Sequence, residues 1–274
     1  MIKNIIVGLA TWKPRDPAAD YAISIAKAFD AHLCGAAISY PPVIAASALE
    51  GLPPDLIEAQ AAESTKATKA AVARYSSAAS AAALSSETLT FETSVSGAAH
   101  TFGVLARHFD LAVVGQPEPD APTSDQLMVE GALFESGHPV VVVPHIQKAG
   151  MDLDRVVVCW DGSRTAARAL ADSLPLLSRA KHVDLVTVSN AGHKSNEHPA
   201  VADHLVRHGI KPEFRHLVAT DVDVASVLLS YVADASAGFM VMGGYGHSRL
   251  REFVLGGVTR SMLQAMTVPT LMSH

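Results

Sequence analysis

NIIVGLA, residues 4–10, is a short run of apolar and mostly β-branched residues, and it returns in kind as RVVVCWD, residues 155–161. Two further pairs follow in the same order: LAVVG at 111–115 with FMVMG at 239–243, and, more loosely, HPVVVVP at 138–144 with VPTLM at 268–272. Runs of this kind are typical of strands that are buried on both faces of a sheet. The repetition predicts two halves built to one design.

Helical patterns separate these runs. Asp16 is suited to cap a helix that starts at Pro17, and Ser163 is suited to cap its counterpart in the second half. Pro175 is expected to end or kink that second helix. Apolar stripes at helical spacing follow the two caps: Ala22, Ile25 and Phe29 after the first, and Ala166, Leu170 and Leu174 after the second. Strands that alternate with helices indicate βαβ units, and therefore a parallel sheet with helices on both faces.

We therefore predict an α/β protein made of two tandem, Rossmann-like, five-stranded parallel-sheet sandwiches. The domains are expected at 1–146 and 152–274, with the polar stretch 144–152 as linker. The Ala-rich stretch 54–83 predicts a long helix, whose counterpart near 198–208 is shorter. Strands are expected at 3–9, 32–39, 87–94, 110–115 and 139–144 in the first half, and at 154–160, 183–189, 212–219, 238–243 and 268–272 in the second.

Composition narrows the class of protein. The 274 residues are enough for about two domains. Hydrophobic residues make up 49% and charged residues 18%, which excludes a disordered chain. A formal net charge of −6 disfavours nucleic-acid binding. No apolar run approaches the roughly 18 residues of a membrane span, and the start of the chain is unlike a signal peptide. Cys34 and Cys159 are too few for a disulfide framework, so we expect a soluble, cytoplasmic protein.

The stretch that follows the run at 239–243 is where binding chemistry is expected, because ligands of open parallel sheets lie beyond the carboxyl ends of the strands. Glycines cluster at 243–246 and again at 256–257, the second time where a helix is expected to start. Glycine lets the backbone approach an anion, and a helix N-terminus attracts one. The glycines alternatively serve only a tight turn and the start of the helix. Other residues suited to a phosphate nearby are His247, Ser248, Arg249, Arg251 and Thr259.

Asp161 stands at the tip of the predicted first strand of the second half. Its carboxylate is able to accept hydrogen bonds from a ribose or from an adenine amine. The alternative is that Asp161 only forms a turn with Gly162. The spacing of the glycines fits neither a P-loop nor a dinucleotide fingerprint.

Residues 243–259 resemble the universal stress protein family, whose ATP-binding members carry G-x2-G-x9-G-[ST] before the last helix. Gly243, Gly246 and Gly256 match the three glycines. Gly257 stands where the family has Ser or Thr, and Thr259 offers a hydroxyl two residues further on. The resemblance implies that the adenine is framed by Asp161 and Val188. It implies that ribose and phosphates are held by the glycine loop, which includes His247, and by Gly256, Gly257, Val258 and Thr259.

The resemblance also implies the architecture of an adenine nucleotide alpha hydrolase-like fold, with sheet order 3-2-1-4-5 in each half. The two halves, or two chains, would pair through their last strands. Because the stretch 268–272 is a short edge strand, Val140–Val143 is a candidate to cover it within one chain. A homodimer stays open.

The first half departs from this pattern. After Gly115 come QPEPDAP, in which prolines remove backbone donors and Glu118 and Asp120 would repel a phosphate. Ala10 replaces Asp161, and the helix start expected near Glu130-Gly131 has no paired glycine and no Ser or Thr. We therefore expect the first half not to bind ATP in the family's manner, and either to pack against the second half or to bind something else.

The function predicted is that of a stress-response regulatory protein that binds ATP, or ADP or AMP, with Mg²⁺ in its second half. Two alternatives remain: a slow ATP hydrolase, although no activated nucleophile or general base is evident, and a scaffold that binds no nucleotide. His204 and His208 share a helix face, but a solvated face is favoured over a metal site because no third ligand stands at a known spacing. No GxSxG motif supports a hydrolase triad.

Overall fold

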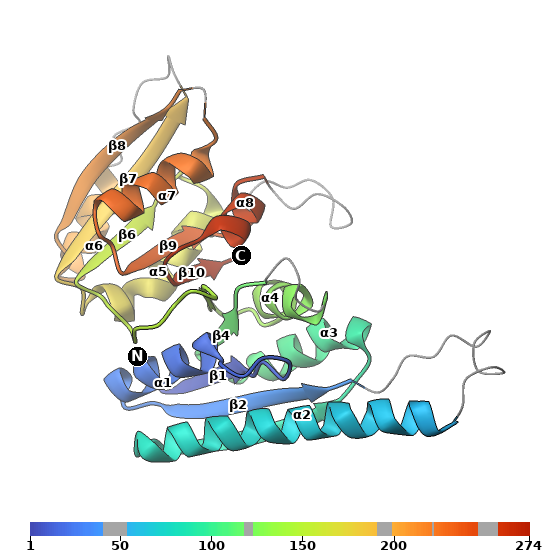
Figure 1. Ribbon diagram of the computed structural model, residues 1–274. Helices are drawn as coiled ribbons and strands as arrows, with labels where there is room; N and C mark the ends of the chain where they lie inside the picture. Colours follow the sequence, from blue (N-terminus) through green and yellow to red (C-terminus); the bar gives the residue numbers. More distant parts are fainter. Residues whose placement is uncertain (41–53, 118–122, 191–198, 221, 246–256) are drawn as a thin grey trace.

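The computed structural model describes residues 1–40, 54–117, 123–190, 199–220, 222–245 and 257–274. Ten strands in these residues form one sheet in the order β3-β2-β1-β4-β5-β10-β9-β6-β7-β8. Figure 1 shows the first half, in blue to green, below the second half, in yellow to red. The α/β class is confirmed, and the order 3-2-1-4-5 is found in the first five strands and again in the last five. No helix in the described ranges is long and apolar enough to cross a membrane.

The bounds of the elements follow the predicted runs closely. The first half contains β1 (Asn4–Gly8), α1 (Pro17–Phe29), β2 (His32–Ser39), α2 (Pro54–Ala81), β3 (Ser86–Glu92), α3 (Val95–Ala106), β4 (Leu111–Gly115), α4 (Thr123–Glu135) and β5 (Val140–Val143). The second contains β6 (Arg155–Cys159), α5 (Arg164–Leu177), β7 (His182–Asn190), α6 (Pro199–Arg207), β8 (Pro212–Ala219), α7 (Val224–Asp234), β9 (Phe239–Gly243), α8 (Gly257–Ala265) and β10 (Thr270–Ser273).

The sheet is covered on both faces. Helices α1, α2, α5 and α6 pack on one face, where Tyr21, Tyr75 and Leu205 are buried. Helices α3, α4, α7 and α8 pack on the other, where Phe102 and Met262 are buried. Neighbouring residues along a strand point to opposite faces, so a strand covered on both sides has to be apolar throughout. This is why the strand runs could be read from the sequence.

The two halves meet through their last strands. β5 and β10 pair antiparallel, with Val142 opposite Thr270 and Val140 opposite Met272. All other neighbours in the sheet pair parallel within the described residues. The pairing joins the two five-stranded sheets into one.

Both predicted caps are confirmed, but Pro175 does not end its helix. Asp16 accepts the N–H of Ala19, and Ser163 accepts the N–H of Ala166. Helix α5 continues through Pro175 to Leu177 instead of ending there. Proline removes only the bond to the carbonyl four residues earlier, and Ala171 is exposed, so water is able to satisfy that carbonyl.

The prediction for the start of the last helix of the first half was wrong. Helix α4 begins at Thr123, so Thr and Ser open it, and Glu130-Gly131 lies in its interior. Gly131 serves helix packing instead: a Cβ there would lie 2.2 Å from the carbonyl oxygen of Ala99 on α3. Gly103 on α3 is also required to be small, because its Cβ would lie 2.7 Å from the carbonyl oxygen of Gly131.

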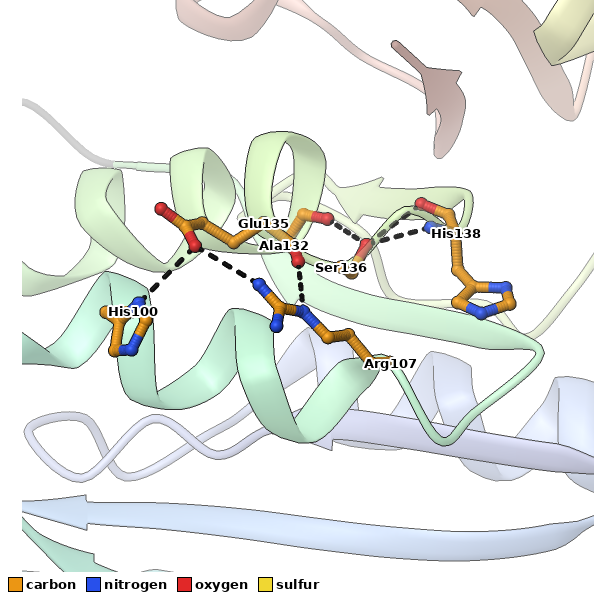
Figure 2. A network of polar contacts seen from close by, with 6 residues as sticks. All are labelled: His100, Arg107, Ala132, Glu135, Ser136 and His138. Carbon is orange, nitrogen blue, oxygen red and sulfur yellow. Dashed lines mark hydrogen bonds and ion pairs between the residues drawn. The ribbon is translucent and has the colours of Figure 1, made fainter.

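Polar contacts at the end of α4 fix the same helix pair (Figure 2). Arg107 donates from Nε to the carbonyl of Glu135 at 2.8 Å. The carboxylate of Glu135 lies 3.5 Å from a terminal nitrogen of Arg107 and 3.4 Å from Nδ1 of His100. The Ser136 hydroxyl donates to the carbonyl of Ala132, and it accepts the N–H of His138 at 3.1 Å. The end of α4 is therefore held firmly on α3.

The substitution Gly131→Ala should lower the free energy of unfolding by about 2 kcal/mol, measured by urea denaturation. A backbone carbonyl cannot move aside as a side chain can, and overpacking typically costs ~1–3 kcal/mol, more than the helix propensity that alanine adds. Gly115→Ala is the control, because a Cβ there meets no atom of the described residues within 4 Å. Equal stability of the two variants would contradict the close packing of α3 on α4.

Candidate functional site

The candidate site lies where the strand order of the second half reverses. β6 pairs with β7 on one side and with β9 on the other. The chain leaves β6 for α5 on one face of the sheet, whereas α8, which follows β9, packs on the other face. Such a point opens a crevice at the carboxyl ends of the strands.

Strand register brings three of the predicted residues to this edge. Cys159 pairs with Val186, so Asp161 and Val188 each lie two residues further along neighbouring strands. Val158 pairs with Val241, which places Gly243 at the end of β9 close to the same level. Val188 is half-buried against the core beneath α7 and α8. An exposed carboxylate and a half-buried apolar side chain thus lie on neighbouring segments at this edge of the sheet.

Asp161 has a structural bond as well as an exposed carboxylate. Its Oδ1 accepts the N–H of Ser163 at 2.9 Å, and Gly162 between them has φ of 75°. The turn-forming interpretation of Asp161 is therefore correct as far as it goes. Because the side chain is exposed, the turn does not prevent the carboxylate from meeting a ligand.

Gly243 is required for packing. A Cβ at this position would lie 2.6 Å from the backbone nitrogen of Ala166 and 2.7 Å from Oγ1 of Thr165, both in the first turn of α5. Only glycine lets the end of β9 come so close to that helix. The glycine thus lets the end of β9 pack directly on the first turn of α5.

The first turn of α8 has exposed residues at its start. Gly257 and Val258 are exposed, and among the described residues no atom lies within 4 Å of the place of a Cβ on Gly257. Thr259 differs, because it is buried and its hydroxyl accepts the N–H of Tyr245 at 3.2 Å. That bond ties the helix to the residues after β9. The predicted residues Gly246, His247 and Gly256, together with Ser248, Arg249 and Arg251, lie outside the described residues.

Tyr245 is a residue that sequence reasoning missed. Its φ is 54°, a left-handed backbone that is uncommon outside glycine, and its ring lies 4.8 Å from the ring of Phe134 in the first half. Its hydroxyl is buried without a hydrogen-bond partner among the described residues. Burial raises the pKa of Tyr245 to about 12. Its only local signal is its place between glycines, since Phe134 is far away in the sequence.

The comparisons with known proteins agree with this architecture. No family model matches the chain. Universal stress protein Slr1230 of Synechocystis sp. is 26% identical over 174 residues, which cover 61% of this chain and 58% of that protein. The match therefore spans less than two thirds of the relative's own length.

Two solved structures are similar over almost the whole chain. A universal stress protein of Archaeoglobus fulgidus has a TM-score of 0.72 and 16% identity, and covers 98% of this chain and 96% of its own. A functionally unknown protein of Pseudomonas aeruginosa has a TM-score of 0.60 and 15% identity, and covers 99% of this chain and 92% of its own. These two likenesses show the fold. Together with the sequence match, they confirm the resemblance to universal stress proteins.

The two thiols should be unreactive in the folded protein. Burial raises the pKa of Cys159 to about 12, with the charge of Asp161 as a second cause, and burial raises that of Cys34 to about 12. A raised pKa favours the neutral thiol, so only about one thiol in ten thousand is ionised at pH 8. Alkylation with iodoacetamide at pH 8, followed by mass spectrometry, should be at least about a hundredfold slower than in urea-unfolded chain. Fast modification of the folded protein at Cys159 would contradict this.

Proposed function

We propose that the chain is a stress-response regulatory protein that binds one adenine nucleotide, ATP or its products ADP and AMP, in its second half. The observation that carries the proposal is the juxtaposition of Asp161, Val188 and the first turn of α8 at the point where the strand order reverses. The proposal places the protein in the cytoplasm, in keeping with the free thiols of Cys34 and Cys159.

Each of these groups suits one part of a nucleotide. Val188 offers an apolar contact for the base, and the Asp161 carboxylate accepts hydrogen bonds from an amine or from ribose hydroxyls. The N–H groups of the first turn of α8 and the helix dipole attract phosphates, and the glycine at 257 lets them approach the backbone. The resemblance assigns the phosphates to the same turn, together with Gly246, His247 and Gly256. Mg²⁺ would accompany the phosphates, because in proteins this ion is usually bound through substrate phosphates and retained waters.

The titratable groups at this edge favour binding over catalysis. Burial raises the pKa of Cys159 and of Tyr245 to about 12, so both stay protonated at neutral pH. Neither is then an effective nucleophile or general base. Asp161 is the described carboxylate at this edge, and one of its oxygens already holds the turn. A nucleotide held here would therefore act through its presence rather than through rapid hydrolysis.

The first half has closed the equivalent position with its own hydrogen bonds. Ala10 stands in place of Asp161, and its N–H donates to the carboxylate of Asp16 at 2.7 Å. Arg74 on α2 donates to the carbonyls of Ala10 and Lys13 at 3.1 and 3.0 Å. The cavity beside this loop, lined by α1 and α2, measures about 130 Å³. Ligand pockets usually exceed roughly 300 Å³, so this space is too small for a nucleotide.

The variant Asp161→Ala tests the proposed site. Calorimetric titration of ATP with Mg²⁺ should give about one nucleotide per wild-type chain and an affinity at least about tenfold lower for the variant, because a hydrogen bond to a charged group is lost. Asp154→Ala is the matched control, since Asp154 is an exposed aspartate at the opposite end of β6.

Other outcomes separate the alternatives. Equal affinities of wild type and Asp161→Ala would remove Asp161 from the site. Two nucleotides per chain would show that the first half binds as well. No binding of ATP, ADP or AMP to the wild type would favour the scaffold, and steady release of ADP would favour a slow hydrolase.

A further inference from the structure

Two neighbouring residues of the first half contact the start of the candidate nucleotide loop in the second half. The ring of Phe134 on α4 lies 4.8 Å from the ring of Tyr245. The ring of His274 stands edge-on to the ring of Phe134 at 5.1 Å. Beside it, a Cβ on Gly244 would lie 3.0 Å from Cδ2 of Leu133. The end of α4 thus forms a support for the residues that directly follow β9.

The supported residues are hydrogen-bonded to the first turn of α8 and to β10. Tyr245 donates its N–H to the hydroxyl of Thr259 in the first turn of α8, at 3.2 Å. Gly244 donates its N–H to the carbonyl of Ser273 on β10, at 2.8 Å. A left-handed backbone at a residue other than glycine persists only when its surroundings hold it. For Tyr245, with φ of 54°, the surroundings are Thr259 on one side and Phe134 on the other.

The contact has an equivalent in the opposite direction. Gln116 follows Gly115 at the end of β4 as Gly244 follows Gly243 at the end of β9. Leu133 and Leu263 each stand seven residues before the first residue of their half's last strand. Gln116 donates from Nε2 to the carbonyl of Leu263 at 2.9 Å, so each half rests its loop on the other's last helix.

The two equivalent contacts differ in kind. Gln116 is almost fully buried, and its side-chain oxygen accepts the N–H of His145 at 3.2 Å. In the first half, the side chain of Gln116 therefore occupies this position and makes the contact through hydrogen bonds. In the second half the place is a glycine, and the contact is made by the apolar side chains of α4. In the second half Gly244 brings no side chain, so its loop is held by the backbone bond to Ser273 and by the apolar side chains of the first half.

The supporting helix is itself rigid. Gly131 and Gly103 bring α4 into backbone contact with α3, and Arg107 binds the last residue of α4, Glu135 (Figure 2). Arg168 on α5 donates to the carbonyl of Gly137 at 3.0 Å, which ties the turn after α4 to the second half. The position of Phe134 is thus set by contacts that lie outside the nucleotide site.

We propose that the first half acts as a built-in support for the nucleotide site of the second half, with Phe134 as its positioning residue. The inference rests on the proposed function. Phe134 holds Tyr245, and Tyr245 holds the first turn of α8 through Thr259, in the arrangement that receives the phosphates. A half without a nucleotide site of its own thereby controls the affinity of its neighbour.

The test compares Phe134→Ala with Phe214→Ala. Phe134 is 45% exposed on α4 and Phe214 is 48% exposed on the edge strand β8, so the two truncations remove similar rings at similar exposure. Phe134→Ala should weaken binding of ATP with Mg²⁺ about tenfold by calorimetry, a usual size for coupling between sites. It should also speed hydrogen exchange at the amides of Gly244 and Tyr245 in the absence of nucleotide. Phe214→Ala should change neither.

Two further variants separate positioning from a general loss of stability. Phe134→Tyr keeps the ring and should retain wild-type affinity and exchange rates. In the double variant Phe134→Ala/Tyr245→Leu, the affinity for ATP should be no lower than that of whichever single variant binds ATP more weakly, because both changes break the same contact. A double variant that loses the product of both effects would show that Phe134 acts without Tyr245, which overturns the proposed path.

Failure of this inference is distinguishable from failure of the proposed function. If the wild type binds ATP and Phe134→Ala binds it equally well, the support role is overturned while the nucleotide site stands. If the wild type binds no nucleotide, the proposed function has failed, and exchange at Gly244 and Tyr245 still decides whether Phe134 holds this loop. Unchanged exchange in Phe134→Ala would overturn that as well.

Discussion

The antiparallel pairing of β5 with β10 is the contact on which the arrangement of the whole chain depends. Each strand would otherwise form the edge of its own five-stranded sheet, with unpaired N–H and C=O groups beside apolar side chains. Val140, Val141, Val142 and Val143 are all fully buried. Burying one valine contributes at least ~1.5 kcal/mol, so exposing half of this surface would cost about 3 kcal/mol. That is a large share of a net stability of roughly 5–15 kcal/mol, and the two halves therefore form one folded unit.

An antiparallel pair of equivalent strands relates the halves by an approximate two-fold rotation, so each half meets the other with the same elements. The loop after the fourth strand of one half comes to rest on the last helix of the other. Symmetry places Gln116 and Gly244 in equivalent positions, and the sequence then treats them differently. A buried glutamine fixes its loop with its own side-chain hydrogen bonds, whereas Gly244 is held by a backbone bond to Ser273 and by the apolar side chains of α4. One scaffold thus holds two equivalent loops by two kinds of contact.

The fold was predictable where local sequence and burial agree. A strand covered on both faces must be apolar throughout, and Asp16 and Ser163 satisfy N–H groups that any helix start leaves unpaired. Prediction was wrong or incomplete where two local interpretations compete. Gly131 suits a helix start as well as a close helix crossing, and only the position of Ala99 on α3 decides between them. Pro175 is tolerated because the carbonyl it leaves without a partner belongs to an exposed residue.

The candidate site also has one part that was predictable from the sequence and one part that was not. Val188 was assigned through the family resemblance, whereas the place of Asp161 just beyond the end of β6 was predictable, because it follows directly on an apolar strand run. The contact of Phe134 with Tyr245 was not, because it joins residues that are far apart in the sequence and follow no common period. Such a contact exists only because β5 and β10 bring α4 next to the loop after β9. A motif search therefore does not find the contacts from the other half that hold the motif in place.

The two interpretations of the glycine cluster, tight packing and ligand approach, are complementary. The missing side chain of Gly243 lets the first turn of α5 touch the end of β9, which fixes one wall of the crevice. Gly257 at the start of α8 is exposed, and the described residues leave the place of a Cβ there free. A phosphate bound by backbone N–H groups needs both conditions, because donors that must first be ordered lose the entropy of ordering when the ligand arrives. Packing at Gly243 thus orders the backbone at the end of β9 before any ligand arrives, and the close packing of α4 on α3 orders the helix that contacts Tyr245.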